Sequence, residues 1–266
     1  MADDLLRWID TAGITEVSIV SPHLDDAAFS TAGLLLSPLA PRCCVVTVFS
    51  EAAADADPAW AAAAGFASPA AEHAARRQED AGVLSGLRVR FEHLGQRPGP
   101  WSPGDASELA ARVLAPTSPR STAQTLVLLP AAAGGEQLPG AIARGIARLA
   151  RRPLGAPAHP EHRQVRDGLL PSLLASGVRV GFYSEFPYLW NERPGALASR
   201  LAALAGRRLA HYALRVKLPQ KMALAQAYRS QLVPVLGAKA AWRERVLDRA
   251  EEYFIVDDGR SAPASA

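Results

Sequence analysis

The residues best suited to chemistry lie in the segment SPHLDDAAFS, where a histidine is followed by two aspartates at the end of an apolar run. His23, Asp25 and Asp26 come directly after a predicted strand, and the two acids stand where a helix should begin. An imidazole and one carboxylate can bind a divalent cation, which leaves the second carboxylate to take a proton from water. An aspartate at a helix start can equally be a simple N-cap, with His23 as a partly exposed neighbour. The spacing alone leaves both interpretations open.

A second segment, APAHPEHRQVRDG, changes this balance. His159 and His162 stand three residues apart at another predicted helix start, again after a strand. A catalytic metal site usually has three protein ligands and one open position for water. His23, Asp26 and one of these two histidines would supply that set, so we predict a metal site. The other histidines fall inside regular segments and are interpreted as surface or hydrogen-bonded core residues: His73, His93 and His211.

Short apolar runs alternate with helical stretches along most of the chain. The predicted strands are Glu16–Ser21, 43–50, 88–94, Thr125–Pro130 and 178–184, and the predicted helices are 25–36, 70–87, 105–114 and 162–175. This alternation predicts an α/β, Rossmann-like three-layer fold, in which a mostly parallel sheet has helices on both faces. Ligands of such sheets bind at the carboxyl ends of the strands, which is where both histidine segments begin.

The pattern changes after residue 186. We expect a helix at Pro194–Ala205, a strand at 211–218, helices at 220–236 and 239–252, and a final strand at 252–256. The late strands should extend the same sheet, so residues 1–266 are predicted to form a single domain with a disordered extreme C-terminus at about 259–266. Two irregular stretches follow strand ends and are candidate substrate walls: 51–69, and 131–158, which contains an apparent extra helix.

Composition narrows the possible classes of protein. The 266 residues are 49% hydrophobic and 21% charged, which is typical of a globular protein. The net charge of +3 comes from scattered arginines without interleaved aromatic residues, so nucleic-acid binding is not expected. Adjacent Cys43 and Cys44 should point to opposite faces of a strand and remain free thiols, as in a reducing compartment. No apolar run approaches the ~20 residues of a membrane span, so the expected location is the cytoplasm.

The two histidine segments resemble the two signatures of the PIG-L/LmbE-like family of zinc-dependent de-N-acetylases. RRQEDAGVLSGL resembles the arginine–glutamate helix of that family, and KMALAQAYRSQL resembles its late helix, so the resemblance runs from about residue 16 to 236. It implies that His23, Asp26 and His162 bind the metal. It also implies that Asp25 is the general base that activates water at the metal, and that protonated His159 stabilises the tetrahedral oxyanion. No separate cofactor-binding residue is implied.

The resemblance further implies a small-molecule substrate, an N-acylated amino sugar or glycoside, and Zn²⁺ as the metal. Another divalent ion such as Fe²⁺ remains an alternative, because two imidazoles and a carboxylate accept several metals. Leu24 replaces the usual proline without removing a ligand. Gln96 replaces an aspartate that many members use for sugar recognition, and the connection at 131–158 is longer than usual. Arg76, Arg77 and Glu51 are candidates for the pocket, although surface ion pairs would explain them equally well.

Two alternatives therefore stay open. One is an amidase of the same fold that acts on a non-sugar metabolite. The other is a non-catalytic protein that binds a nucleotide or cofactor in the cleft. The absence of G-x-G-x-x-G after the first strand and the presence of Asp25 count against this second alternative. The oligomeric state does not follow from the sequence.

Overall fold

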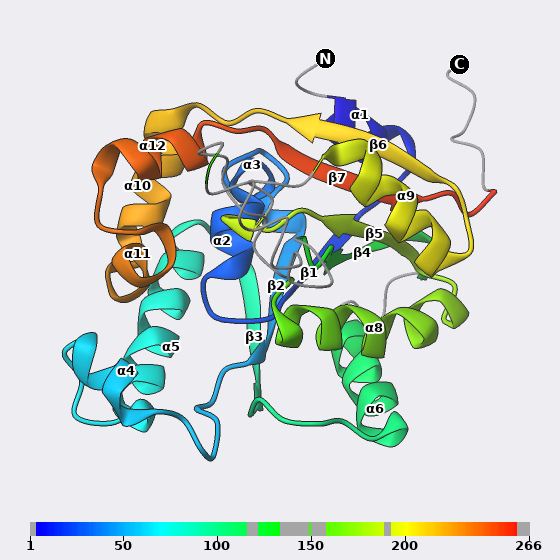
Figure 1. Cartoon of the computed structure of the whole chain (residues 1–266). Helices are drawn as coiled ribbons and strands as arrows, with labels where there is room; N and C mark the ends of the chain where they lie inside the picture. The colour runs from blue at the N-terminus through cyan, green and yellow to red at the C-terminus, as the bar shows by residue number, and fades with distance from the viewer. Residues whose placement is uncertain (1–3, 116–121, 134–148, 150–157, 189–192, 260–266) are drawn as a thin grey trace.

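A seven-stranded sheet forms the centre of the protein (Figure 1). The structure is a computed structural model that describes residues 4–115, 122–133, 149, 158–188 and 193–259. The strand order is β3-β2-β1-β4-β5-β7-β6. The strands are β1 (Glu16–Ser21), β2 (Cys43–Phe49), β3 (Arg90–Gln96), β4 (Thr125–Pro130), β5 (Arg179–Tyr183), β6 (Leu209–Leu214) and β7 (Glu251–Val256).

Strands β1 to β5 are parallel to one another, and β7 is antiparallel to both of its neighbours, β5 and β6, so that β6 runs in the same direction as the first five strands. Every residue of β1, β2, β4 and β5 is buried, as expected for parallel strands that are covered on both faces. The late strands extend the same sheet. The predicted mostly parallel α/β sheet is confirmed.

Helices cover both faces of the sheet. They are α1 (Asp4–Thr11), α2 (Asp26–Ser30), α3 (Ala32–Leu35), α4 (Pro58–Ala63), α5 (Pro69–Gly86), α6 (Pro103–Leu114), α8 (Pro160–Ala175), α9 (Pro194–Ala205), α10 (Leu218–Ala227), α11 (Arg229–Leu236) and α12 (Ala240–Leu247). The chain moves from β1 outward to β2 and β3, and then from β4 outward to β5 in the opposite direction. Because parallel crossovers are right-handed, α2, α3 and α5 cover one face while α6 and α8 cover the other (Figure 1).

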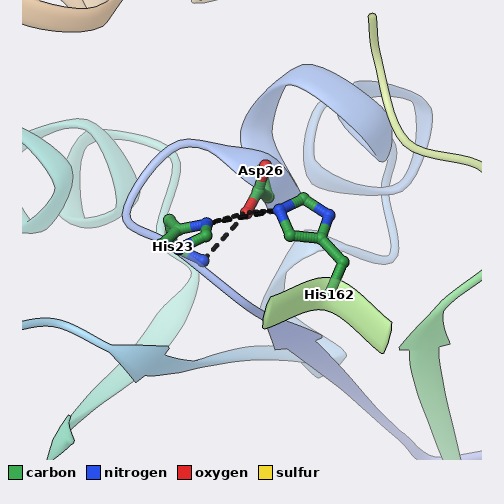
Figure 2. A group of neighbouring side chains, drawn as sticks. All are labelled: His23, Asp26 and His162. Carbon is green, nitrogen blue, oxygen red and sulfur yellow. Dashed lines mark hydrogen bonds and ion pairs between the residues drawn. The ribbon is translucent and has the colours of Figure 1, made fainter. Parts of the chain in front are cut away.

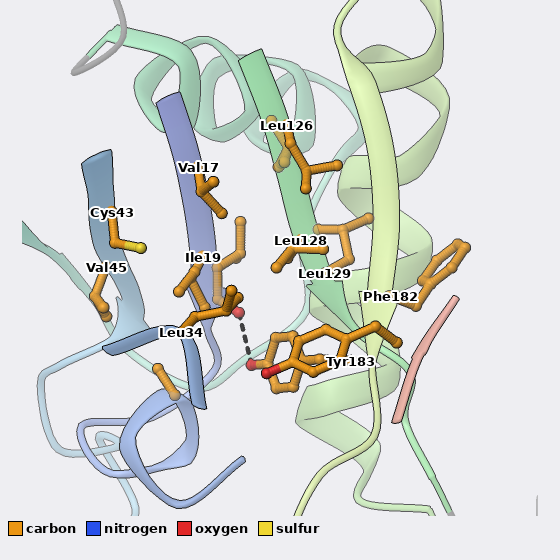
Figure 3. Packing of buried hydrophobic residues seen from close by; sticks show 14 of the residues in the cluster. Val17, Ile19, Leu34, Cys43, Val45, Leu126, Leu128, Leu129, Phe182 and Tyr183 are labelled. Carbon is orange, nitrogen blue, oxygen red and sulfur yellow. Dashed lines mark hydrogen bonds between the residues drawn. The ribbon is translucent and has the colours of Figure 1, made fainter. Parts of the chain in front are cut away.

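The hydrophobic core lies between these layers. Val17 and Ile19 of β1 lie beside Leu126 and Leu128 of β4 (Figure 3), and all four residues are 0% exposed. Tyr183, at the end of β5, donates a hydrogen bond from its hydroxyl to the backbone oxygen of residue 20 at 2.8 Å. The ends of β1 and β5 are thereby fixed relative to each other. The two cysteines of β2 are buried free thiols, as predicted.

Several predicted elements are interrupted. The helix expected at 25–36 is two short helices, because the backbone leaves the helical conformation at Thr31 (φ −129°, ψ 28°). The helix expected at 220–236 is likewise divided into α10 and α11 at Tyr228 (φ −88°, ψ 67°), whose hydroxyl donates to the buried Asp80 at 2.6 Å. Tertiary contacts thus override helix propensity at the second break.

The remaining differences concern element bounds. The helix expected at 239–252 ends as α12 at Leu247, and the strand expected at 211–218 lies earlier, as β6. Helices α1 and α4 were not expected, and α4 lies inside the stretch 51–69. The apparent extra helix within 131–158 and the C-terminal residues 260–266 lie outside the described residues. Among the residues that are described, no helix is long and apolar enough to cross a membrane.

Candidate metal centre

The fold brings the two histidine segments together at one point of the sheet. Strands β1 and β4 are neighbours, but their connections leave in opposite directions. A crevice forms outside the carboxyl ends of two such strands, and open α/β sheets bind their ligands there. His23 and Asp26 follow β1, while His162 lies in the first turn of α8, after β4.

Three side-chain atoms converge at this edge of the sheet (Figure 2). Asp26 Oδ2 lies 3.1 Å from His23 Nδ1 and 3.3 Å from His162 Nε2, and the two ring nitrogens are 3.3 Å apart. Ligand atoms at about 2.0–2.1 Å from a tetrahedral metal ion would be about 3.3–3.4 Å from one another. The spacing of these three atoms therefore fits a shared divalent cation.

Each histidine of this group is oriented by a further carboxylate. His162 Nδ1 lies 3.1 Å from Glu185 Oε1, and His23 Nε2 lies 2.5 Å from Glu161 Oε2. When the inner nitrogens bind a metal, the proton on each outer nitrogen donates to the carboxylate and the lone pair of each inner nitrogen points to the metal. Carboxylate partners of this kind fix the tautomer of metal-binding histidines and raise their basicity.

Neither carboxylate was among the predicted site residues. Glu161 stands between the two histidines of its own motif, so its position was a usable signal. Glu185 lies in SEFP after β5, where no motif marks it. It is 0% exposed, and it also accepts hydrogen bonds from the backbone N–H groups of Ala132 at 2.9 Å and Ala133 at 3.1 Å. The Glu185 carboxylate thus links the backbone that follows β4 to the ring of His162.

Replacing Glu185 with glutamine should weaken metal binding about 10–100-fold, the usual cost of losing an outer carboxylate. The neutral amide keeps the side-chain shape but is a weaker acceptor for the His162 Nδ1 proton. A chelator competition would measure the dissociation constant. Glu79→Gln is a matched control, since Glu79 accepts hydrogen bonds from Ser230 in α11 and should leave metal affinity unchanged. An E185Q protein with wild-type affinity would disprove this role.

Asp25, the general base that the resemblance implies, is buried next to Asp26 at the start of α2. It is 3% exposed, and its Oδ1 accepts a hydrogen bond from Arg76 Nη2 at 3.0 Å. It precedes α2 but makes no side-chain capping hydrogen bond, so the N-cap interpretation does not explain it. Burial raises the pKa of Asp25 to about 6, against the opposing charge of Arg76. A carboxylate in this environment binds a proton more readily than one in water.

Arg77 and Glu51 pair with each other, whereas Arg76 contacts Asp25. Arg77 forms an ion pair with Glu51 at 2.8 Å and also donates to the backbone oxygen of Ser50 at 2.8 Å. This matches the ion-pair interpretation of these two residues. Gln96 is the last residue of β3, and its backbone oxygen accepts a hydrogen bond from the N–H of Glu51 at 3.2 Å. It therefore stands at the strand-end edge without a described contact to the metal ligands.

His159 lies beside the centre rather than in it. Its ring is 4.7 Å from the ring of His162 and 5.4 Å from that of His23. Burial, together with the charges of His162 and His23, lowers the pKa of His159 to about 4. The imidazole of the metal-free protein is then neutral at pH 7, so the cationic form expected from the sequence is not its resting form. Tyr188, which the sequence did not single out, has its ring 5.2 Å from that of His162.

Protons should compete with metal at His23. Burial opposes the charged imidazolium, but hydrogen bonds and charges from Asp26 and Glu161 outweigh it and raise the pKa of His23 to about 9. Because a metal binds the neutral imidazole, binding at pH 7 should release about one proton from this residue. Affinity should rise about tenfold per pH unit and level off above pH 9. Titration calorimetry in buffers of different ionisation enthalpy measures this release; binding without it would contradict the prediction.

Comparison with known proteins supports the fold. No protein-family model matches the sequence, and no curated protein is significantly similar to it. Among solved structures, the zinc-inhibited form of teicoplanin deacetylase Orf2 matches with a TM-score of 0.62 and 20% identity, over 91% of this chain and 98% of that one. The pseudoaglycone deacetylase Dbv21 matches at 0.60 and 23%, over 91% and 96%. A deacetylase in complex with teicoplanin matches at 0.56 and 21%, over 91% and 98%. The chain has the fold of these deacetylases.

Proposed function

We propose that this protein is a metal-dependent hydrolase that removes an N-acetyl or other N-acyl group from an amino sugar or glycoside. The observation that carries the proposal is the position of Asp25, a buried carboxylate directly beside the convergent His23, Asp26 and His162. The fold shared with the deacetylases supports it, as does the resemblance of both histidine segments to PIG-L/LmbE-like signatures.

A divalent cation bound by the three residues would act as a Lewis acid toward the scissile amide. Asp25 takes a proton from the attacking water as its oxygen bonds to the carbonyl carbon, and later returns a proton to the amine when the C–N bond breaks. Arg76 holds one oxygen of Asp25, which fixes the carboxylate for this transfer. The rings of His159 and Tyr188 lie 4.7 Å and 5.2 Å from that of His162, and an N–H or O–H donor from either residue would stabilise the developing oxyanion.

We propose Zn²⁺ as the resident metal, with Fe²⁺ as the alternative. Two imidazoles and one carboxylate bind both ions, and affinity alone does not select between them. The structure of Orf2 is described as a zinc-inhibited form, so the activity of the present protein should be compared across several metals rather than with zinc alone.

The substrate class follows from the related structures only by analogy. One neighbour was crystallised with teicoplanin, and another is a pseudoaglycone deacetylase, so an amino-sugar glycoside is the first candidate. Gln96 at the strand-end edge, in place of a sugar-binding aspartate, favours the second candidate, an amidase of the same fold that cleaves a non-sugar amide.

The test is a screen of metal-reconstituted protein with detection of free amine. N-acetylated amino sugars and glycosides would be compared with N-acylated amines that lack a sugar. We expect amine release from the sugar series, its loss on chelation and its return when metal is restored. Release from the non-sugar series alone would favour the amidase, and binding without turnover of any N-acyl compound would favour a binding protein.

A further inference from the structure

A lysine is fully buried in α10, in contact with an acid and an aromatic ring. Lys221 is 1% exposed; its Nζ lies 2.9 Å from Glu251 Oε1 and 3.7 Å from the centre of the Phe186 ring. Glu251 is 0% exposed. Lysines are almost never fully buried without a partner, and a buried ion pair seldom stabilises a fold more than apolar residues of the same volume would. The pair therefore calls for a role other than stability.

The acid of this pair is held on its other side. Glu251 Oε2 accepts hydrogen bonds from the N–H of Gly33 in α3 and from the hydroxyl of Tyr253, both at 2.9 Å. The approach to α3 is so close that a Cβ at Gly33 would overlap Leu214 and lie 3.0 Å from Glu251 Oε2. Glu251 is thus a fixed support for the ammonium group.

The aromatic ring belongs to the segment that orients a metal ligand. Phe186 directly follows Glu185, whose carboxylate contacts His162. The N–H of Phe186 donates to Ser30 Oγ of α2 at 3.1 Å, and the N–H of Ser184 donates to the backbone oxygen of Glu252 at 2.9 Å. The segment 184–186 therefore has a fixed backbone on both sides of Glu185. The Lys221 ammonium on the Phe186 ring completes its attachment.

We propose that Lys221 is a positioning residue for the metal centre. Its ammonium, fixed by Glu251, holds the ring of Phe186 and thereby keeps Glu185 in place to orient His162. A desolvated cation is attracted to an aromatic ring more strongly than a solvent-exposed cation is. The attraction acts over the face of the ring, so the contact is directional. The inference rests on the proposed metal centre, because it concerns how one ligand of that centre is held.

The test removes the charge pair without leaving an unpaired carboxylate. In the double variant Lys221→Met, Glu251→Gln, methionine keeps an unbranched chain and glutamine can still accept from Gly33. We expect the cobalt(II) dissociation constant to rise about tenfold, the low end for residues behind a metal ligand, and the visible spectrum of the bound cobalt to change. In a Glu185→Gln background the same double change should have little further effect, because it acts through Glu185.

Two further variants separate this role from a general effect on the fold. Arg179→Met removes a comparable buried cation at the opposite end of β5. There Arg179 Nε lies 3.7 Å from Asp258 Oδ2, and Arg179 Cζ lies 5.9 Å from the centre of the Trp8 ring. It should leave cobalt affinity and spectrum unchanged. Phe186→Leu breaks the same link from the other side and should reproduce the spectral change even if the lysine variant fails to fold.

Wild-type cobalt affinity and spectrum in the folded variants at 221 and 186 would overturn the inference, as would an undiminished effect in the Glu185→Gln background. A wild-type chain that binds no cobalt would be a separate result, because it overturns the metal centre itself and this inference with it.

Discussion

Replacing Asp25 with asparagine should lower kcat about 10²–10⁴-fold and leave the metal bound, since general acid–base catalysis contributes about that much. Asparagine has nearly the same shape but cannot take a proton from water. The proposed ligand atoms belong to His23, Asp26 and His162, so the change removes none of them. Turnover and metal content should be measured on the same preparation.

Asp80→Asn is the matched control for this change. Asp80 is also a buried carboxylate, but it contacts His93 and Tyr228 rather than the crevice. Its replacement should affect stability while kcat stays within a few-fold of the wild type. An Asp25→Asn protein with unchanged kcat would exclude the general base, and one that loses its metal would make Asp25 a ligand instead.

Replacing His162 with alanine should nearly abolish metal binding. Four-ligand structural zinc sites bind with about 10–16 kcal/mol, so one ligand accounts for about 3–4 kcal/mol, or about 10²–10³-fold in affinity. His162 is 1% exposed and its Nδ1 contacts Glu185, whereas the ring of His159, 4.7 Å away, lies beside the convergent group. Metal content after dialysis and chelator competition are the measurements, and turnover should fall in parallel.

His93→Ala is the control for this second change. His93 is also paired with a buried aspartate, through Nε2 at 2.8 Å from Asp80 Oδ2, but it lies in β3 and is not predicted to bind metal. Metal content should stay at the wild-type level. Equal metal content in the His162 and His93 variants would show that the ligand assignment is wrong.

The convergence of His23, Asp26 and His162 could be predicted because it depends mainly on topology. Strands β1 and β4 have the predicted bounds, Glu16–Ser21 and Thr125–Pro130. Once a parallel sheet is expected, residues that follow two neighbouring strands must meet at the carboxyl edge. His23 and His162 meet there although they are 139 residues apart in the chain.

The residues around the ligands could not be found in the same way. Glu185 and Tyr188 lie in a segment after β5 whose path is set by contacts with Ser30 and Lys221, and no local pattern encodes those contacts. The helix break at Tyr228 has the same origin, since its hydroxyl bonds to Asp80, which is 148 residues away. The resting protonation of His159 likewise follows from burial and neighbouring charges rather than from its motif.

Metal-dependent hydrolysis is tested most directly by titrating metal into chelator-treated protein, with release of free amine from an N-acetylated amino sugar as the readout. We expect no turnover without metal, a linear rise with added metal and a break at about one equivalent per chain, because one such group, His23–Asp26–His162, lies within the described part of the chain. Turnover that survives complete removal of metal would contradict this expectation.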